Sequence, residues 1–367
     1  MKTIFITQPL LPKKEDMFAQ IEEIFASKHL TNMGAKHNLL EQKLKEVLKV
    51  PHLQVFNNGT TALLIALKSL KLPFHSEVIT TPFTFAATPY SISWNELNPV
   101  FCDIEQNTMT IDADKIESLI TKKTSAILAV HVYGFPCNVV KIEKMAKKYD
   151  LKVIYDAAHA FTTEIDGKGI GTFGDITMFS FHATKLFNTI AGGALTFNSK
   201  FLEREICNLR NFGRIDESAV EDIGLNGKLN EFQAAFGLLN LEIFEKEKQK
   251  RAKLKDFYDK NLSKIKGIRI PQMPGNVTNS YQYYPIVIED DYAINRDELY
   301  EKFRKNNIMV RKYFYPACSD YECYKDLASS KHENLPVTND IKNRVLCLPF
   351  YGELSLEDTK DIFKILV

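Results

Sequence analysis

The sequence predicts an α/β fold with a large, mostly parallel sheet and a smaller α+β lobe towards the C-terminus. Short apolar runs alternate with helical patterns over the first half of the 367-residue chain, which indicates strands joined by crossover helices. After about residue 228 the pattern changes to long helical stretches followed by separate strand-like runs. We therefore expect a large domain over residues 1–240 and a small domain over residues 241–367. A long helix that joins the two lobes would blur this boundary.

Each expected element follows from the spacing of its apolar residues. Helical spacing of leucines predicts helices over residues 38–48 and 60–71. Four apolar runs predict buried strands: Glu77–Thr81, Ala126–Val132, Val153–Tyr155 and Ile176–Phe181. Amphipathic spacing predicts a helix over Val139–Tyr149. The C-terminal lobe is expected to contain helical structure over Leu229–Leu262, strands over Tyr284–Ile288 and Ile308–Tyr313, and a final helix after Ser355.

Composition and charge exclude several classes of function. The chain is 45% hydrophobic and 25% charged with a net charge of +1, so it has no excess of basic charge for a broad nucleic-acid or membrane surface. Six scattered cysteines form no CxxC pair, and we expect idle thiols and no metal site. The N-terminal apolar patch is too short for a signal peptide, and no apolar run is long enough to cross a bilayer. We expect a cytoplasmic protein with no membrane or nucleic-acid partner.

A GxGxxG pattern at Gly169–Gly174 is similar to the fingerprint of dinucleotide-binding folds. That fingerprint needs a strand before it and a helix after it. Here the strand-like run Asp175–Phe181 follows it, and Asp166-Gly167 before it is typical of a turn. We interpret the pattern as a glycine-rich turn.

Residues that directly follow the apolar runs are the candidate site, because open α/β sheets bind ligands beyond the carboxyl ends of their strands. Asn57–Thr61 precedes a helix, whose N-terminus would either bind a phosphate beside Gly59 or simply be capped by threonine. Asp156 ends a strand, and it would either hold a proton on a ligand nitrogen or cap the next turn.

Lys185 follows another strand in apolar, glycine-rich surroundings. A lysine there is either a solvated surface charge or a desolvated nucleophile with a lowered pKa. Phe83 is expected in the core, whereas Phe85 is a candidate for contact with a ligand ring. A phosphate cradle, an aromatic face, a carboxylate and a lysine are together what a pyridoxal phosphate (PLP) site needs.

These motifs, in this order, resemble the nucleotide-sugar aminotransferases of the DegT/DnrJ group, within the fold-type I PLP enzymes. The similarity covers nearly the whole chain and is carried by Leu30–Gly34, Asn58–Leu63, Thr81–Ala86, His131–Pro136, Asp156–Ala160, Gly171–Asp175, Ser180–Lys185, Leu225–Asn226, Leu229–Ala235 and Arg344–Pro349. The resemblance implies a fold-type I architecture with PLP as the cofactor.

The resemblance also implies a role for individual residues. Lys185 would bond covalently to the PLP aldehyde and transfer protons, and Asp156 would pair with the ring nitrogen. Phe85 would stack on the ring, and His159 would lie near the ring oxygen. Three residues would bind the cofactor phosphate: Gly59, Thr60 and Ser180. Asn226 would reach the phosphate in the neighbouring subunit, which implies a homodimer with shared active sites.

The substrate follows from the tract Ser180–Asn188, which is similar to members that aminate C4 of a dTDP-4-keto-6-deoxyhexose. L-Glutamate would donate the amino group and leave as 2-oxoglutarate. The product would be dTDP-4-amino-4,6-dideoxyglucose or its galactose epimer, for O-antigen or another surface glycan. Ala191 stands where the family often has Glu, and Gly227-Lys228 stands where Tyr-Arg is common, so the sugar end departs from the pattern.

Three alternatives stay open from the sequence. The first is amination at C3, or of a UDP-linked sugar. The second is another PLP enzyme on the same scaffold, such as a cyclitol aminotransferase or an aminobenzoate-type synthase. The third is a binding or regulatory homologue without activity, although an intact Lys185 and Asp156 argue against it. The sequence also places Arg311, Tyr313 and Tyr315 where the small lobe of relatives approaches the substrate, and a tyrosine-rich core edge explains them equally well.

Overall fold

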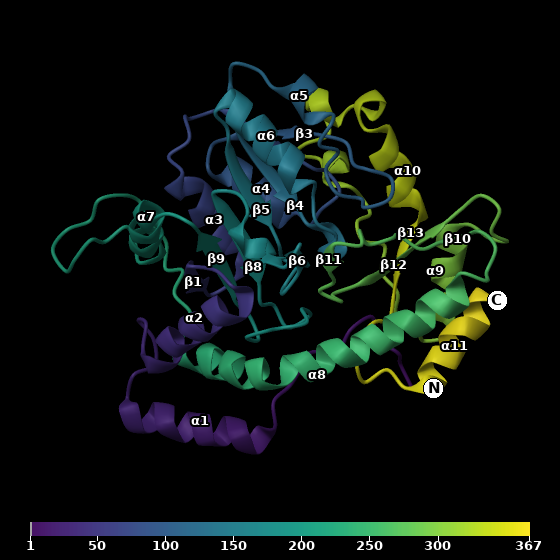
Figure 1. Cartoon of the computed structure of the whole chain (residues 1–367), viewed down its shortest axis with the longest axis horizontal. Helices are drawn as coiled ribbons and strands as arrows, with labels where there is room; N and C mark the ends of the chain where they lie inside the picture. The colour runs from purple at the N-terminus through teal and green to yellow at the C-terminus, as the bar shows by residue number, and fades with distance from the viewer. Residues whose placement is uncertain (1) are drawn as a thin grey trace.

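A seven-stranded sheet forms the centre of the large lobe in the computed structural model, which describes residues 2–367 (Figure 1). Its strands lie in the order β1 (His52–Phe56), β9 (Gly193–Phe197), β8 (Ile176–Ser180), β5 (Lys152–Asp156), β4 (Thr124–Val130), β2 (Glu77–Thr80) and β3 (Asn98–Phe101). The strands from β8 to β3 pair in parallel, and only β9 runs antiparallel to its two neighbours, β1 and β8. The predicted mostly parallel sheet is therefore confirmed.

Helices cover both faces of this sheet, because neighbouring strand residues point to opposite sides. In β4, Leu128 packs into the core beneath α3 (Gly59–Ser69), whereas its neighbours Ile127 and Ala129 pack with α6 (Val139–Tyr149). On the α3 face, α4 (Ala87–Trp94) and α7 (Lys200–Arg210) complete the layer. On the opposite face, α2 (Ala35–Leu48) and the first turns of the long helix α8 (Glu231–Leu262) cover β1, β9 and β8.

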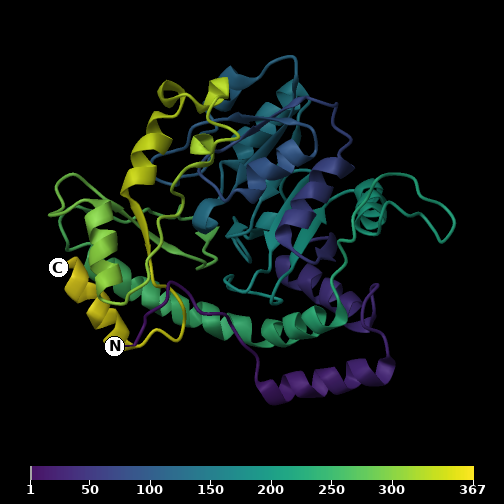
Figure 2. The ribbon, with the colours of Figure 1, turned by 180° about the vertical axis from the view of Figure 1, so that it is seen from behind.

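The 32-residue helix α8 runs beneath both lobes, and α1 (Lys14–Ser27) packs along it (Figures 1 and 2). Residue 240, where the sequence places the domain boundary, lies inside this unbroken helix. The division into residues 1–240 and 241–367 stays a prediction.

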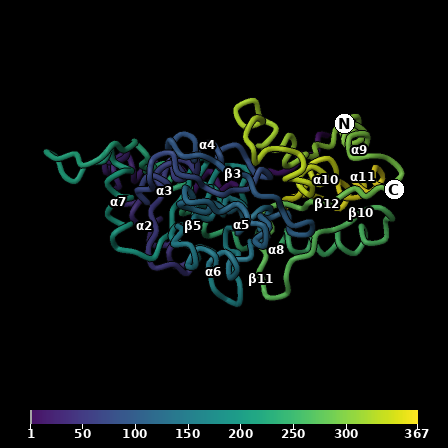
Figure 3. The backbone as a smooth tube through the Cα atoms, turned by 90° about the horizontal axis from the view of Figure 1, so that it is seen from above, coloured from purple at the N-terminus to yellow at the C-terminus, as the bar shows by residue number. Residues whose placement is uncertain are grey.

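The small lobe is built on an antiparallel sheet of β10 (Ile268–Arg269), β12 (Tyr284–Ile288) and β13 (Val345–Leu348). Its helices are α9 (Arg296–Lys305), α10 (Pro336–Arg344) and α11 (Leu356–Leu366). Ile4, near the N-terminus, packs into the same core, and both ends of the described chain lie on this lobe (Figure 3). A short sheet of β11 (Val277–Thr278), β6 (Glu164–Ile165) and β7 (Lys168–Gly169) joins the two lobes.

The prediction of a strand over Ile308–Tyr313 is wrong. Its backbone forms two isolated bridges with different partners, Ile308 with Ile4 and Arg311 with Cys347. The apolar side chains Ile308 and Val310 enter the core, which explains the alternation in the sequence. No single neighbour runs alongside the segment, however, so no ladder forms.

The remaining elements agree with expectation to within a few residues, and the helix over Val139–Tyr149 agrees at both ends. The GxGxxG pattern spans the end of β7 and a short 3-10 turn over Ile170–Thr172 before β8, with the hairpin turn at Asp166-Gly167 ahead of it. No helix among residues 2–367 is both long and apolar enough to cross a membrane.

Candidate active site

A cavity of about 320 Å³ lies where β2, β4, β5 and β8 end and α3 begins. Seven of the eight predicted site residues line it: Gly59, Thr60, Phe85, Asp156, His159, Ser180 and Lys185. They come from four separate segments of the sequence and meet because the carboxyl ends of parallel strands share one edge of a sheet. Asn226 does not line this cavity.

Asp156, the last residue of β5, is buried at the floor of the site. Its two oxygens accept hydrogen bonds from the Thr88 hydroxyl at 2.8 Å and from the Ala158 N–H at 3.0 Å. Burial raises the pKa of this carboxyl, although the two hydrogen bonds and the Lys185 charge oppose the shift. One oxygen thus caps the next turn, as one of the two sequence readings expects, while the side chain also borders the cavity. Its pairing with a ligand nitrogen stays a prediction.

Lys185 lies in the loop between β8 and β9 and borders the cavity. Its Nζ lies 5.6 Å from the centre of the Tyr283 ring. Desolvation by the surrounding protein lowers the pKa of Lys185 to about 8, even though the Asp156 carboxylate acts in the opposite direction. About a tenth of this amine is therefore uncharged at pH 7, far more than for a lysine of ordinary pKa, and the uncharged form is the one that a nucleophile or proton acceptor requires.

His159 is buried, and its ring is fixed from two sides. Its Nδ1 accepts a hydrogen bond from the Tyr133 N–H at 3.1 Å, and the Tyr283 ring packs edge-on against it at 4.9 Å between centroids. Burial, helped by the Lys185 charge, holds the pKa of His159 well below its usual range. The ring is therefore neutral, and because Nδ1 accepts, its proton resides on Nε2 as a donor.

The N-terminus of α3 faces the same cavity. The helix is capped by Asn58, whose Oδ1 accepts the Thr61 N–H at 2.8 Å, so the alternative of a threonine cap is wrong. The N–H groups of Gly59 and Thr60 precede the intrahelical ladder and are available to an anion. A Cβ on Gly59 would lie 3.3 Å from the Ser180 Cβ, so glycine keeps the cradle between them open.

The two phenylalanines after β2 separate as expected. Phe83 is fully buried against Tyr133 and Phe314. Phe85 borders the cavity and is 64% exposed. Its ring is thus free to cover a flat ligand.

Three aromatic residues of the small lobe complete the wall of the cavity, and two of them, Tyr283 and Phe314, were not predicted from the sequence. The third is Tyr313, whereas Arg311 and Tyr315 do not line the cavity. No spacing pattern links these residues to Lys185, because they approach from the other lobe. The only sequence signal for these wall residues is the number of tyrosines around them.

Asn226 lies at the end of a projecting segment, residues 211–226, which we call the arm (Figures 1 and 2). The Asn226 side chain is exposed, and its carbonyl accepts a hydrogen bond from the Asn57 side chain at 3.0 Å. The arm carries exposed apolar side chains: Phe212, Ile215, Val220, Ile223 and Leu225.

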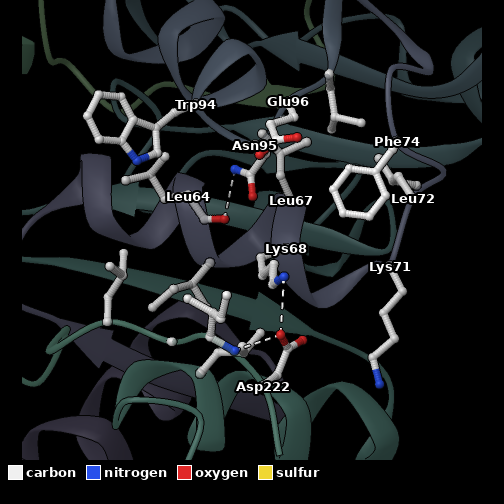
Figure 4. A pocket seen from close by; sticks show the side chains of 16 residues that line it. Leu64, Leu67, Lys68, Lys71, Leu72, Phe74, Trp94, Asn95, Glu96 and Asp222 are labelled. Carbon is white, nitrogen blue, oxygen red and sulfur yellow. Dashed lines mark hydrogen bonds and ion pairs between the residues drawn. The ribbon is translucent and has the colours of Figure 1, made fainter.

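A larger hollow of about 440 Å³ lies between α3, the end of α4 and the arm (Figure 4). Both of its lysines are already paired, Lys68 with Asp222 at 3.2 Å and Lys71 with Glu205 at 2.8 Å. Trp94 and Phe74 at its rim are exposed. Its two lysines are neutralised within the protein, so the chemistry favours the smaller cavity around Lys185.

The fold is that of the fold-type I aminotransferases. The model of the DegT/DnrJ/EryC1/StrS aminotransferase family matches residues 12–367, and the chain belongs to this family. It is 44% identical over 356 residues to a dTDP-4-amino-4,6-dideoxy-D-glucose transaminase of Shigella dysenteriae, covering 96% of this chain and 95% of the relative. A protein of the same name from Escherichia coli is 44% identical over 371 residues, covering 100% and 98%.

Solved structures agree with the sequence relatives. The crystal structure of DesI in the presence of its TDP-sugar product superposes with a TM-score of 0.94 at 29% identity, covering 100% of this chain and 92% of that one. Helicobacter pylori PseC, an aminotransferase involved in the biosynthesis of pseudaminic acid, gives 0.92 at 29% identity, covering 100% and 98%. The predicted family and fold class are thereby confirmed.

The lowered pKa of Lys185 predicts its reactivity in the cofactor-free protein. Modification by trinitrobenzenesulfonate should reach half its maximal rate near the pKa of about 8, because only the uncharged amine attacks. Lys141 is the control, since its hydrogen bond to Asp114 raises the pKa of that lysine and its modification needs more alkaline solution. Peptide mapping by mass spectrometry across a pH series measures both residues. A shared pH profile would show that Lys185 is not desolvated.

Proposed function

We propose that this chain is a PLP-dependent aminotransferase that moves the amino group of L-glutamate to C4 of dTDP-4-keto-6-deoxyglucose. The observation that carries the proposal is one cavity in which a lysine of lowered pKa, a buried carboxylate and an open helix N-terminus lie together. The relatives named dTDP-4-amino-4,6-dideoxy-D-glucose transaminase support the choice of sugar and position. The product would supply O-antigen or another surface glycan.

The residues of the cavity fit PLP. The N–H groups at the start of α3 and the Ser180 hydroxyl would hold the phosphate, in the space that a Cβ on Gly59 would narrow. Asp156 would hold a proton on the ring nitrogen, Phe85 would cover the ring, and the His159 Nε2–H would donate to the ring oxygen. When bound, PLP supplies an aldehyde for the amino group and a ring that withdraws electrons from the carbon attached to it.

The protein's own part in the reaction is binding and proton transfer. Lys185 would take the proton from the substrate Cα as a free amine and return it to the neighbouring carbon, a role for which a pKa of about 8 is suited. Asp156 would keep its negative charge opposite the ring nitrogen, which offsets the cost of burying that charge. The aromatic wall of Tyr283, Tyr313 and Phe314 would exclude water from the reacting atoms.

The test is a comparison of keto-sugars with the purified, PLP-loaded protein and L-glutamate. We expect the highest kcat/KM with dTDP-4-keto-6-deoxyglucose, and a product with the mass of the 4-amino sugar together with 2-oxoglutarate. Turnover of only a dTDP-3-keto sugar, only UDP-linked sugars or only a non-nucleotide ketone would contradict the substrate assignment. A protein that releases no 2-oxoglutarate with any of these ketones would contradict the reaction itself.

We also propose a homodimer in which the arm carries Asn226 to the cofactor phosphate of the partner subunit. Exposed Asn226 lies outside its own cavity, and the apolar side chains of the arm need a partner surface to be buried. Six free thiols, of which four are buried, support a reducing, cytoplasmic setting for this assembly.

Val220→Asp should dissociate this dimer. Val220 is 67% exposed on the arm, and burying a carboxylate without a partner at an interface costs several kcal/mol, which weakens the association of the two subunits. Val140→Asp is the matched control, because Val140 is 71% exposed on α6, away from the arm. Light scattering should give half the mass for Val220→Asp and an unchanged mass for Val140→Asp. A wild-type monomer, or equal masses for both variants, would contradict the shared-site assembly.

A further inference from the structure

A strap of the small lobe, residues 280–283 between β11 and β12, reaches the large-lobe residues of the site. The Ser280 hydroxyl donates to the backbone carbonyl of His159 at 2.7 Å, and the Tyr283 ring packs against the His159 ring. Gln282, between them, is only 2% exposed and does not line the cavity. Its side chain points instead at the loop that carries Lys185.

The Gln282 amide binds the backbone on both sides of Lys185. Its Oε1 accepts the Leu186 N–H at 2.7 Å, and its Nε2 donates to the Thr184 carbonyl at 3.1 Å. These two peptide groups directly flank the lysine. A third hydrogen bond, from the Lys185 N–H to the His182 carbonyl at 2.8 Å, lies within the lysine loop itself and forms a turn over residues 182–185.

A glutamine side chain suits this position because it carries a donor and an acceptor on one planar group. A carboxylate keeps the acceptor for Leu186 but places a second acceptor against the Thr184 carbonyl. A leucine of similar size leaves both backbone groups buried without a partner. The lysine loop would then lose the two backbone hydrogen bonds, at Thr184 and Leu186, that Gln282 makes with it.

We propose that Gln282 is a positioning residue for Lys185: its amide fixes the backbone of the lysine so that the amine reaches both the cofactor aldehyde and the substrate Cα. This inference rests on the proposed function. Gln282 acts through Lys185, and the strap makes the geometry of the lysine depend on the docking of the small lobe. A displacement of about 1 Å in a reacting group costs on the order of 10²-fold in rate.

The experiment compares Gln282→Leu and Gln282→Glu with a matched control, Gln54→Leu. Gln54 is a buried glutamine on β1 whose Nε2 donates to the Glu203 carbonyl at 2.7 Å, and it does not line the cavity. Two readouts are needed. The first is the rate at which cofactor-free protein captures PLP on Lys185, monitored by absorbance and by borohydride trapping. The second is kcat and KM for glutamate, determined separately. Circular dichroism melting identifies any variant that does not fold.

For Gln282→Leu we expect capture and kcat to fall on the order of 10²-fold, with KM for glutamate little changed. Gln282→Glu should show a smaller loss, since it keeps one of the two bonds, and Gln54→Leu should match the wild type. If Gln282→Leu does not fold, the test rests on folded Gln282→Glu, in which slower capture of PLP on Lys185 supports the positioning role. Wild-type capture and kcat in a folded Gln282 variant would overturn the inference. Failure of the wild type itself to capture PLP on Lys185 would instead overturn the proposed function.

Discussion

Lys185→Arg is expected to lower kcat for aminotransfer by at least about 10⁴-fold, the upper end of what a positioned acid–base group contributes. Arginine keeps the positive charge and most of the length of the side chain. Its guanidinium stays protonated at any accessible pH, so it has no free amine to bond to an aldehyde or to take a proton. Turnover measured as 2-oxoglutarate released from glutamate tests this expectation.

Lys248→Arg is the matched control for this substitution. Lys248 is also a partly buried lysine, and burial lowers its pKa as well, but it lies on α8 and binds the Thr162 hydroxyl at 3.1 Å outside the cavity. Its replacement should leave kcat unchanged. Comparable losses in the two variants would show that desolvated lysines matter here for folding, and that Lys185 has no chemical role of its own.

Asp156→Asn is expected to lower kcat by roughly 10²-fold while PLP still binds. A hydrogen bond to a charged group is worth about 1.5–3 kcal/mol, which corresponds to about 10- to 150-fold in an equilibrium or a rate. The neutral amide is nearly isosteric with the carboxylate but does not hold a proton on the ring nitrogen. Steady-state kinetics with glutamate, together with a PLP titration of the cofactor-free protein, separate the loss of rate from a loss of binding.

The same substitution has a second, independent effect on Lys185. The Asp156 carboxylate raises the pKa of Lys185 against the larger effect of burial, so its removal should move the midpoint of Lys185 modification below the wild-type pKa of about 8. Thr88→Val is the control, because it removes a hydrogen bond from Asp156 and leaves the charge in place. An unchanged midpoint in Asp156→Asn would show that the two groups do not interact across the cavity.

The sequence predicted those parts of the site that have local causes. Asp156 and Ser180 end β5 and β8, and Lys185 lies in the loop after β8; the runs that form these two strands are recognisable from their apolar residues alone. A shared sheet edge then brings them together. The helix α6 was predicted at both ends because its period is undisturbed.

Contacts between the lobes could not be predicted in this way. Gln282 binds both sides of Lys185 from 97 residues further along the chain, and no spacing or composition signals such a pair. Within the large lobe, the Thr88 hydroxyl on α4 donates to Asp156, and no spacing signals this pair either. The wrong strand over Ile308–Tyr313 has a related cause, since its alternation reflects core packing while its backbone pairs with two different neighbours. Burial patterns report which side chains are inside, and they do not report which partners lie across a lobe boundary.

The central claim is that Lys185 is the residue to which PLP bonds. Purified protein should turn yellow on addition of PLP, and borohydride should then fix the cofactor irreversibly to a single peptide, the one that contains Lys185. Peptide mapping by mass spectrometry measures the site directly, with Lys248 and Lys141 as internal references for non-specific labelling. Label on Lys185 alone is the expected result. Label spread over surface lysines, or a protein that stays colourless with PLP, would contradict the account.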